Sequence, residues 1–178
     1  METLKLGRTI FQVLLEGLGH SPDLLGNFTK EPIVAMKMIR YPPSSAYKPG
    51  QFGIGAHNDF GGVTVLLQQP GKEGLEVWHK GREEWLPVPA LENVYVINVG
   101  DMIQQWSGGA YVSARHRVVK KGETERISCA TFWHGDIDAS NPLNPNDPNK
   151  VTVGQLFVKR FGTQFQLDPV MREKYGIV

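Results

Sequence analysis

Between Val34 and Phe132 the sequence is a series of short runs rich in Val, Ile, Leu and aromatic residues, and turn signals interrupt these runs repeatedly. The interruptions are Pro42-Pro43, Pro49-Gly50, Gly61-Gly62, Pro70-Gly71, Lys80-Gly81 and Lys121-Gly122. Gly and Pro give the chain the backbone angles that tight turns need, so the runs between them fit short β-strands. Many short strands with frequent turns predict a β-sandwich or a β-barrel.

A helical pattern precedes this region. Its apolar residues follow the i, i+3, i+4, i+7 spacing of one helix face, which predicts a helix over about residues 3–18. The residues on this face are Phe11, Leu14, Leu15 and Leu18. Gly19 stands where a glycine commonly ends a helix.

A second helix is predicted after the β region. Thr152 is followed three residues later by Gln155, the pattern of a capping box, and this predicts a helix over about residues 153–161. The stretch 136–150 is rich in Asn, Asp and Pro and is expected to be an exposed loop. The sequence therefore predicts one mostly β domain over residues 1–178, with a core over about 33–137 and flanking N- and C-terminal helices.

The composition restricts the class of protein. The chain has 178 residues, 40% hydrophobic and 21% charged, which is enough to form one sizeable core. A net charge of +1 gives no indication of nucleic acid or an anionic membrane as a partner. Cys129 is the one cysteine, which excludes an internal disulfide, and no apolar stretch approaches the roughly 18 residues that span a bilayer. Because Glu2 and Lys5 interrupt any signal-peptide pattern, we expect a cytoplasmic enzyme.

Three residues have the chemistry of a metal site. His57 and Asp59 are two apart, so in an extended strand both side chains project to one face while Asn58 points away. His116 lies much further along the chain, and the fold must bring it back from another strand. Two His and one carboxylate leave open positions on a six-coordinate ion, as in non-haem Fe(II) oxygenases. A His-x-Asp pattern by itself is more often a surface or hydrogen-bonded pair. If the three residues do form one site, it is built from non-adjacent strands, and a double-sheet jelly roll is the β fold that best suits such a site.

Arg126 and Ser128 are a second pair of residues that share one face of a strand. A guanidinium can meet a carboxylate with two parallel hydrogen bonds, and a hydroxyl beside it can donate a third. The pair therefore suits a dicarboxylate such as 2-oxoglutarate, whereas an isolated Arg-x-Ser would more often be a surface cross-strand pair.

The motifs together resemble one family, the Fe(II)/2-oxoglutarate-dependent oxygenases of the isopenicillin N synthase-like branch. Seven segments match in the family's order. They are Ile39-Arg40-Tyr41-Pro42-Pro43, Gly55-Ala56-His57-Asn58-Asp59-Phe60-Gly61, Val63-Thr64-Val65-Leu66-Leu67, Gly74-Leu75-Glu76-Val77, Trp85-x-x-Val88-Pro89, Asn98-Val99-Gly100-Asp101 and Ser113-x-x-His116-Arg117-Val118.

The resemblance implies a double-stranded β-helix (jelly roll) that uses Fe(II), 2-oxoglutarate and O2 to hydroxylate, desaturate or cyclise a small molecule, with succinate and CO2 as coproducts. By this resemblance His57, Asp59 and His116 bind the iron, and Arg126 and Ser128 bind the distal carboxylate of 2-oxoglutarate. Two alternatives stay open. One is an Fe(II) oxidase of the same fold that does not use 2-oxoglutarate, and the other is a truncated, catalytically silent metal-binding domain.

Other residues are weaker candidates. By the resemblance Tyr41 donates its hydroxyl to 2-oxoglutarate, although a Tyr before two prolines can be a packing residue. The candidates for the wall of a substrate pocket are Phe60, Trp106, Phe132, Trp133 and His134, although aromatic residues at such spacings are more often core. His20 and His79 are expected at a helix end and in a turn.

The chain departs from the family mainly in length, because members of this branch are usually nearly twice as long and have an N-terminal region that packs on the core. Substrate turnover is therefore less firmly predicted than the binding of metal and cosubstrate. Apolar surface that this region covers in relatives would favour self-association.

Overall fold

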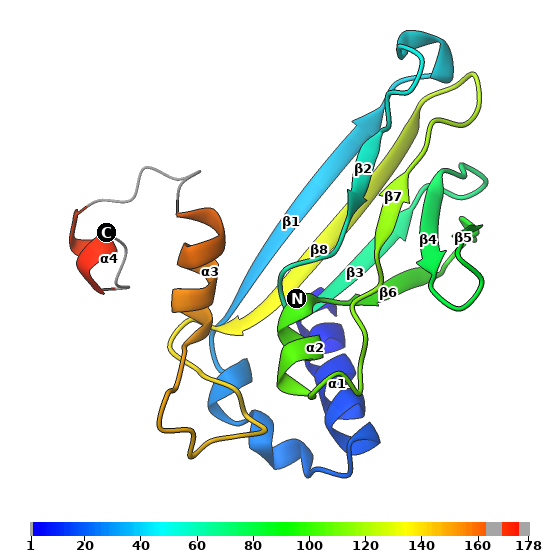
Figure 1. Cartoon of the computed structure of the whole chain (residues 1–178). Coiled ribbons are helices and arrows are strands. Elements are labelled where there is room, and N and C mark those ends of the chain that lie inside the picture. Colours follow the sequence, from blue (N-terminus) through cyan, green and yellow to red (C-terminus); the bar gives the residue numbers. More distant parts are fainter. Residues whose placement is uncertain (1, 163–168, 175–178) are drawn as a thin grey trace.

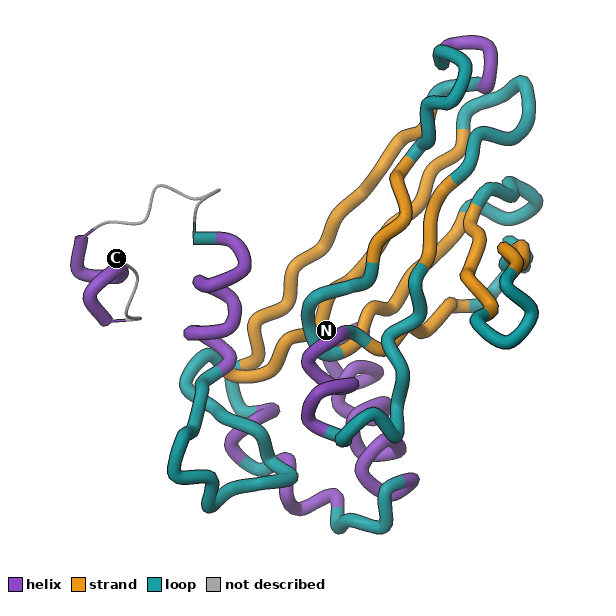
Figure 2. The backbone as a smooth tube through the Cα atoms, in the orientation of Figure 1, coloured by secondary structure: helices purple, strands orange, loops and turns teal. Residues whose placement is uncertain are grey.

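The computed structural model describes residues 2–162 and 169–174, which form two facing antiparallel sheets with helices around one end (Figures 1 and 2). The first sheet has the order β1 (Pro32–Tyr41), β8 (Arg126–Asp136), β3 (Val63–Gln68) and β6 (Tyr95–Val99). The second has the order β2 (Ile54–His57), β7 (His116–Val118), β4 (Leu75–His79) and β5 (Glu84–Pro87). Strands distant in sequence are neighbours in both sheets, which confirms the mostly β jelly-roll prediction.

The helices and short turns complete the fold. The α-helices are α1 (Glu2–Gly17), α2 (Asp101–Trp106), α3 (Val153–Phe161) and α4 (Pro169–Lys174), and the 3-10 turns are η1 (Pro22–Leu25), η2 (Asn27–Thr29) and η3 (Ser44–Ala46). In the described part of the chain, no helix is both long and apolar enough to cross a lipid bilayer. The predicted N-terminal helix is present as α1, and the backbone at Gly19 has a φ of 77°, a left-handed angle that suits glycine just beyond a helix end.

The capping box at Thr152 is also present. The Thr152 hydroxyl accepts the amide hydrogen of Gln155, and the Gln155 side chain accepts the amide hydrogen of Thr152. These two bonds satisfy backbone donors that the first turn of α3 would otherwise leave free. Residues 137–150 form no helix or strand, as predicted, and several Asx side chains accept nearby backbone amides there. The loop is not exposed throughout, because Ala139 and Leu143 pack against the main core, and Asp136 still belongs to β8.

The inner face of the first sheet, which looks toward the second sheet, is defined by strand alternation. Tyr41 and Ile39 of β1 pack with Leu66 and Val96 against Leu75 and Val118 of the second sheet. Along β8 the residues that share this inner face are Arg126, Ser128, Ala130 and Phe132, because they pair in register with inner residues of β1 and β3.

The outer face of the first sheet carries the main hydrophobic core at its lower end. There Trp133 is 2% exposed and lies 5.6 Å, centroid to centroid, from Phe11 of α1. Gly7 of α1 packs directly on the Trp133 indole, where a Cβ would lie 2.2 Å from its Nε1. This close approach explains why a glycine faces the sheet at that turn of α1.

A β-bulge interrupts the regular pairing of β8 with β1. Ile33 and Val34 are consecutive in β1 but pair with Gly135 and Trp133, so His134 is the extra residue. A bulge turns its extra residue out of the normal alternation. The His134 ring is thereby packed on Gly61, where an added Cβ would lie 2.0 Å from its Nδ1.

Candidate metal and cosubstrate site

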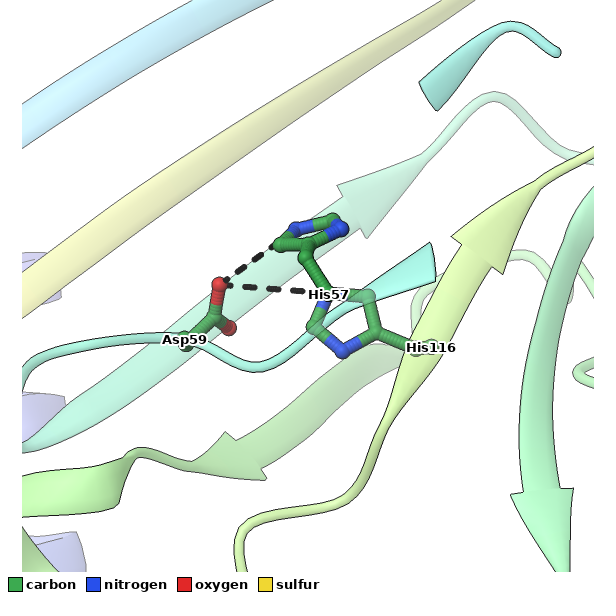
Figure 3. Close-up of side chains that lie close together, drawn as sticks. All are labelled: His57, Asp59 and His116. Carbon is green, nitrogen blue, oxygen red and sulfur yellow. Dashed lines mark ion pairs between the residues drawn. The ribbon is translucent and has the colours of Figure 1, made fainter. Parts of the chain in front are cut away.

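Strand pairing brings the predicted metal ligands together. His57 at the end of β2 lies directly opposite His116 at the start of β7, and their ring centroids are 4.3 Å apart. Asp59 follows β2, and its Oδ1 lies 3.8 Å from Nε2 of each histidine (Figure 3). One ligand atom from each of the three residues falls within 4.8 Å of the others, which is close enough for a single ion to bind all three.

Backbone carbonyls fix the two imidazoles in the form that a metal needs. Nδ1 of His57 lies 2.8 Å from the Gly55 carbonyl oxygen, and Nδ1 of His116 lies 2.9 Å from that of Ala114. A carbonyl oxygen can only accept a hydrogen bond, so each Nδ1 must carry the proton. In the neutral ring this leaves Nε2, the atom nearest Asp59, as the nitrogen that can bind a metal, an arrangement typical of metal-binding histidines.

Asp59 is oriented by two donors that the sequence analysis did not identify. Its Oδ2 accepts hydrogen bonds from Thr64 Oγ1 at 2.7 Å and Asn98 Nδ2 at 2.8 Å, which leaves Oδ1 to face the histidines. Thr64 and Asn98 are directly opposite each other in the β3–β6 pairing. Period-two alternation in β3 and β6 could have placed them on one face, but only the tertiary fold shows that this face meets Asp59.

Asn58 points away from the cluster, as predicted. Its side-chain amide donates to the carbonyl oxygen of Ser113 at 2.8 Å and to the Ser113 hydroxyl at 3.2 Å. The Ser113 amide in turn donates to Gln104 Oε1 of α2 at 2.7 Å. These bonds tie the segment before His116 to the segment that carries His57 and Asp59.

Arg126 and Ser128 are buried on the inner face, 4% and 3% exposed. The Arg126 guanidinium lies 4.8 Å from the centre of the Tyr41 ring and donates from Nη2 to Gln68 Oε1 at 2.9 Å and from Nε to the Lys72 carbonyl oxygen at 3.2 Å. Its Nη1 is buried with no hydrogen-bond partner among the described residues.

A buried guanidinium with an unpaired N–H group needs an acceptor, because an unsatisfied donor of a charged group is costly. A carboxylate would satisfy it, so the observed residues fit the distal end of a dicarboxylate. Tyr41 contributes its ring face to the guanidinium here, and Gln68, which was not predicted, holds one side of it. Strand β3 supplies one supporting group to each residue, since Thr64 contacts Asp59 and Gln68 contacts Arg126.

Three of the predicted pocket residues lie near the ligands. Phe60 follows Asp59 directly, Phe132 pairs in register with Thr64, and the His134 ring centre lies 6.0 Å from that of Phe60. Helix α3 adds two rings that sequence reasoning missed, with Phe157 at 5.6 Å from His134 and Phe161 at 5.4 Å from Phe60. An aromatic cluster therefore borders the Asp59 side of the site.

The two tryptophans belong elsewhere. Trp106 lies 5.5 Å from Phe28 and packs against the main core, and Trp133 is buried under α1 on the outer face of the sheet. The structure packs both in the core and not beside the metal ligands, because aromatic character predicts burial but not the face on which a side chain is buried. His20 follows the end of α1, as expected, whereas His79, which was expected in a turn, is the last residue of β4 and pairs with Glu84.

The electrostatics of His134 differ from those of the ligand histidines. Burial among aromatic rings lowers its pKa to about 4, although the negative charge of Asp59 opposes this shift. His134 is therefore neutral at neutral pH, and its buried Nδ1 has no hydrogen-bond partner in the described part of the chain.

Comparisons with known proteins agree with this geometry. The model of the 2OG-Fe(II) oxygenase superfamily matches residues 31–135. The 2-oxoglutarate-dependent dioxygenase thnC of Trichoderma harzianum is 67% identical over 166 residues, covering 93% of this chain and 52% of the relative. The 2-oxoglutarate-dependent dioxygenase caaD of Aspergillus niger is 48% identical over 171 residues, covering 96% of this chain and 53% of the relative.

Solved structures show the same fold. JOX2, crystallised with 2OG, Fe and JA, superimposes with a TM-score of 0.75 at 26% identity, over 98% of this chain and 53% of that one. The dioxygenase for auxin oxidation 1 from Arabidopsis thaliana, in complex with 2-oxoglutarate, gives a TM-score of 0.66 at 31% identity, over 76% of this chain and 49% of that one.

A two-sheet jelly roll with a His-x-Asp…His cluster defines the class of non-haem iron oxygenases. This chain belongs to the 2OG-Fe(II) oxygenase superfamily, and the curated relatives that it matches are named 2-oxoglutarate-dependent dioxygenases. It spans about half the length of the curated relatives that it matches.

Proposed function

We propose that this protein binds Fe(II) through His57, Asp59 and His116 and oxidises a small organic molecule with 2-oxoglutarate and O2, forming succinate and CO2. The observation that carries the proposal is that one ring nitrogen from each of His57 and His116 and one Asp59 oxygen lie within 4.8 Å of one another. The names of the relatives, 2-oxoglutarate-dependent dioxygenases, support it.

The other residues have roles that follow from their contacts. When bound, the iron and 2-oxoglutarate supply the oxidising chemistry. Arg126 Nη1 and the Ser128 hydroxyl bind the distal carboxylate of 2-oxoglutarate, while Gln68 and Tyr41 hold the guanidinium in place. Phe60, with the α3 rings beside it, keeps water from this side of the site.

Two measurements test the proposal. Purified protein is titrated anaerobically with Fe(II) and then with 2-oxoglutarate, following the visible charge-transfer band expected of a keto acid on iron, and succinate is measured after O2 is admitted. We expect His57→Ala to abolish iron binding, because too few protein ligands remain. His79→Ala, a histidine outside the cluster, is the matched control and should bind normally.

Arg126→Ala separates the cosubstrate site from the metal site. It should retain iron but lose 2-oxoglutarate affinity by on the order of 2–5 kcal/mol, and Arg126→Lys should recover part of this. Normal 2-oxoglutarate affinity in Arg126→Ala would contradict the proposed role. If the wild-type protein binds iron but no 2-oxoglutarate, the result favours an Fe(II) oxidase of the same fold that does not use 2-oxoglutarate. If it binds neither, the result favours a catalytically silent domain.

We also propose that the protein self-associates through the outer face of the first sheet, in the part that α1 does not cover (the upper part in Figure 1). Cross-strand pairing places Met38, Cys129, Leu67 and Tyr95 in one row, and Met38 is 73% exposed. The row contains no charged side chain, and the Arg40–Glu125 ion pair beside it presents both signs of charge. A second copy of the same face therefore meets apolar surface without net repulsion.

A further inference from the structure

We propose that the substrate of this site is an organic acid with an apolar, aromatic-sized body, and that Lys37 binds its acidic group. This inference rests on the proposed function, and it adds the class of substrate. The observation behind it is an unpaired cation on the inner face of the first sheet, beside the residues that surround the metal and cosubstrate site.

Register places Lys37 on that face. It pairs with Ala130 of β8, which lies between Ser128 and Phe132 on the inner face. The inner positions of β1 that follow Lys37 are Ile39, opposite Ser128, and Tyr41, beside Arg126. Since directly paired residues project to the same side, Lys37 continues the row that begins at the cosubstrate residues.

The second sheet does not cover this part of β1. Tyr41 is buried and Ile39 is half-buried in the core between the sheets, whereas Lys37 and the next inner residue, Ala35, are exposed. Lys37 therefore stands where the space between the sheets opens to solvent. In the described ranges, 2–162 and 169–174, its ammonium takes part in no hydrogen bond or ion pair with a protein group.

Apart from Ser128, the neighbouring inner residues are apolar. Lys37 is paired with Ala130. On one side of this pair lie Ala35 and Phe132, and on the other lie Ile39 and Ser128. An ammonium on such a surface lacks a counter-charge, and an anionic group of a bound molecule would supply one. Arg126 is already directed at the distal carboxylate of 2-oxoglutarate, so Lys37 is the cation on this row that remains for the substrate.

The rest of the surroundings suit an aromatic or similarly flat apolar body. Phe132 adjoins the Lys37 pair on the inner face, and Phe60, His134 and Phe157 form the aromatic cluster beside Asp59. Because His134 is held neutral, this cluster adds no second positive charge at neutral pH. The class indicated is therefore a monoanionic aromatic or apolar acid held by one charged contact.

An inward lysine on an edge strand can also serve the fold, since it discourages pairing with another chain. Strand β1 is at the edge of its sheet. The edge role requires only a charge and gives no preference among small molecules, so a preference for acids that depends on Lys37 distinguishes the two roles.

The experiment compares acids with their uncharged amides. Protein loaded with Fe(II) and saturating 2-oxoglutarate under nitrogen is titrated calorimetrically with benzoic, trans-cinnamic and 2-naphthoic acids and with the primary amide of each. Saturating 2-oxoglutarate keeps the probe acids from the Arg126 site. The variants are Lys37→Met, which keeps the length and removes the charge, Lys37→Arg, which keeps a charge, and Lys80→Met in the β4–β5 turn as the control.

We expect wild type to bind at least one acid roughly fivefold more tightly than its amide, the upper range for a single solvent-accessible ion pair. The preference should fall to about one in Lys37→Met, persist in Lys37→Arg and Lys80→Met, and weaken as salt is raised. Unchanged 2-oxoglutarate affinity in Lys37→Met shows that the variant is folded.

The proposal is overturned if wild type shows no preference for any acid, or if the preference survives in Lys37→Met. The preceding 2-oxoglutarate titration separates this failure from failure of the proposed function. Normal 2-oxoglutarate binding without acid preference rejects only the role of Lys37, whereas absence of 2-oxoglutarate binding in wild type rejects the proposed activity.

Discussion

At the scale of single residues, the orientation of Asp59 depends on groups outside the His-x-Asp segment. Thr64 and Asn98 hold one carboxylate oxygen so that the other faces the histidines. Partners that orient a metal ligand commonly contribute about 10–100-fold to metal affinity. We therefore expect Thr64→Val, which keeps the shape and removes the hydroxyl, to weaken Fe(II) binding roughly tenfold.

Anaerobic Fe(II) titration of the purified variant measures this. Thr131→Val is a matched control, because Thr131 is buried on the opposite face of the sheet, paired with Val65. Equal iron affinity in Thr64→Val and Thr131→Val would show that the Thr64 hydroxyl does not support the metal site.

The buried His134 gives stability a defined pH dependence. Its folded-state pKa of about 4 is below the ordinary value of 6.5, so the unfolded chain takes up the proton first as pH falls. The contribution of the neutral ring is complete above pH 6.5 and is lost as pH falls toward 4, at about 1.4 kcal/mol per pH unit and about 3 kcal/mol in total.

His134→Gln removes this titration while keeping a polar side chain. Urea unfolding of metal-free protein between pH 7 and pH 4 should show a smaller loss of stability in His134→Gln than in wild type. The exposed His20 provides the control variant His20→Gln, which should follow wild type. Parallel curves for wild type and His134→Gln would contradict burial of a neutral imidazole.

At the scale of helices and strands, sequence patterns predicted the elements whose formation depends on residues close together in the chain. The apolar face of α1 and the capping box of α3 were readable because helix spacing and end-capping involve residues within a few positions. The bulge at His134 and helices α2 and α4 were not predicted. The bulge is defined by the partner strand β1, whose register no local pattern of β8 contains.

The site was predicted to a similar extent. Within each motif, His-x-Asp or Arg-x-Ser, the two named residues project to the same face of their strand, so their residue types were informative before the fold was known. Gln68, Phe157 and Phe161 gave no such signal, because an amide or a phenylalanine has many uses and their positions beside Arg126, His134 and Phe60 arise only when β3, α3 and β8 assemble.

Helix α3 is the element by which the C-terminal part of the described chain reaches the site. Removing its cap with Thr152→Ala should destabilise the first turn of α3 by about 1 kcal/mol, which corresponds to roughly fivefold faster local amide exchange. Hydrogen exchange followed by mass spectrometry should show this in α3 and not in β8. Thr9→Ala removes a hydroxyl that bonds within α1 but caps nothing, and should leave α3 unchanged; unaltered α3 exchange in Thr152→Ala would argue against the capping box.

At the scale of the whole molecule, the helices cover the outer face of the first sheet only in part. Strands β1 and β8 extend past α1 (Figure 1). The exposed apolar residues that register places on the outer face are Met36 and Met38 of β1, Ile127 of β8, Leu67 of β3, and Tyr95 and Ile97 of β6. Because an exposed apolar sheet face gains free energy when it is covered, we expect a concentration-dependent dimer in sedimentation experiments.

Met38→Glu places a charge in the centre of this face and should shift the protein to monomer, because two copies would then bury unpaired carboxylates against apolar rows. Val112→Glu is the control, since Val112 is similarly exposed at 70% but lies in the loop before β7. Sedimentation equilibrium of wild type and both variants at matched ionic strength gives the answer. A monomeric wild type at high concentration, or a Met38→Glu variant that associates as wild type does, would show that this face is not a contact between copies.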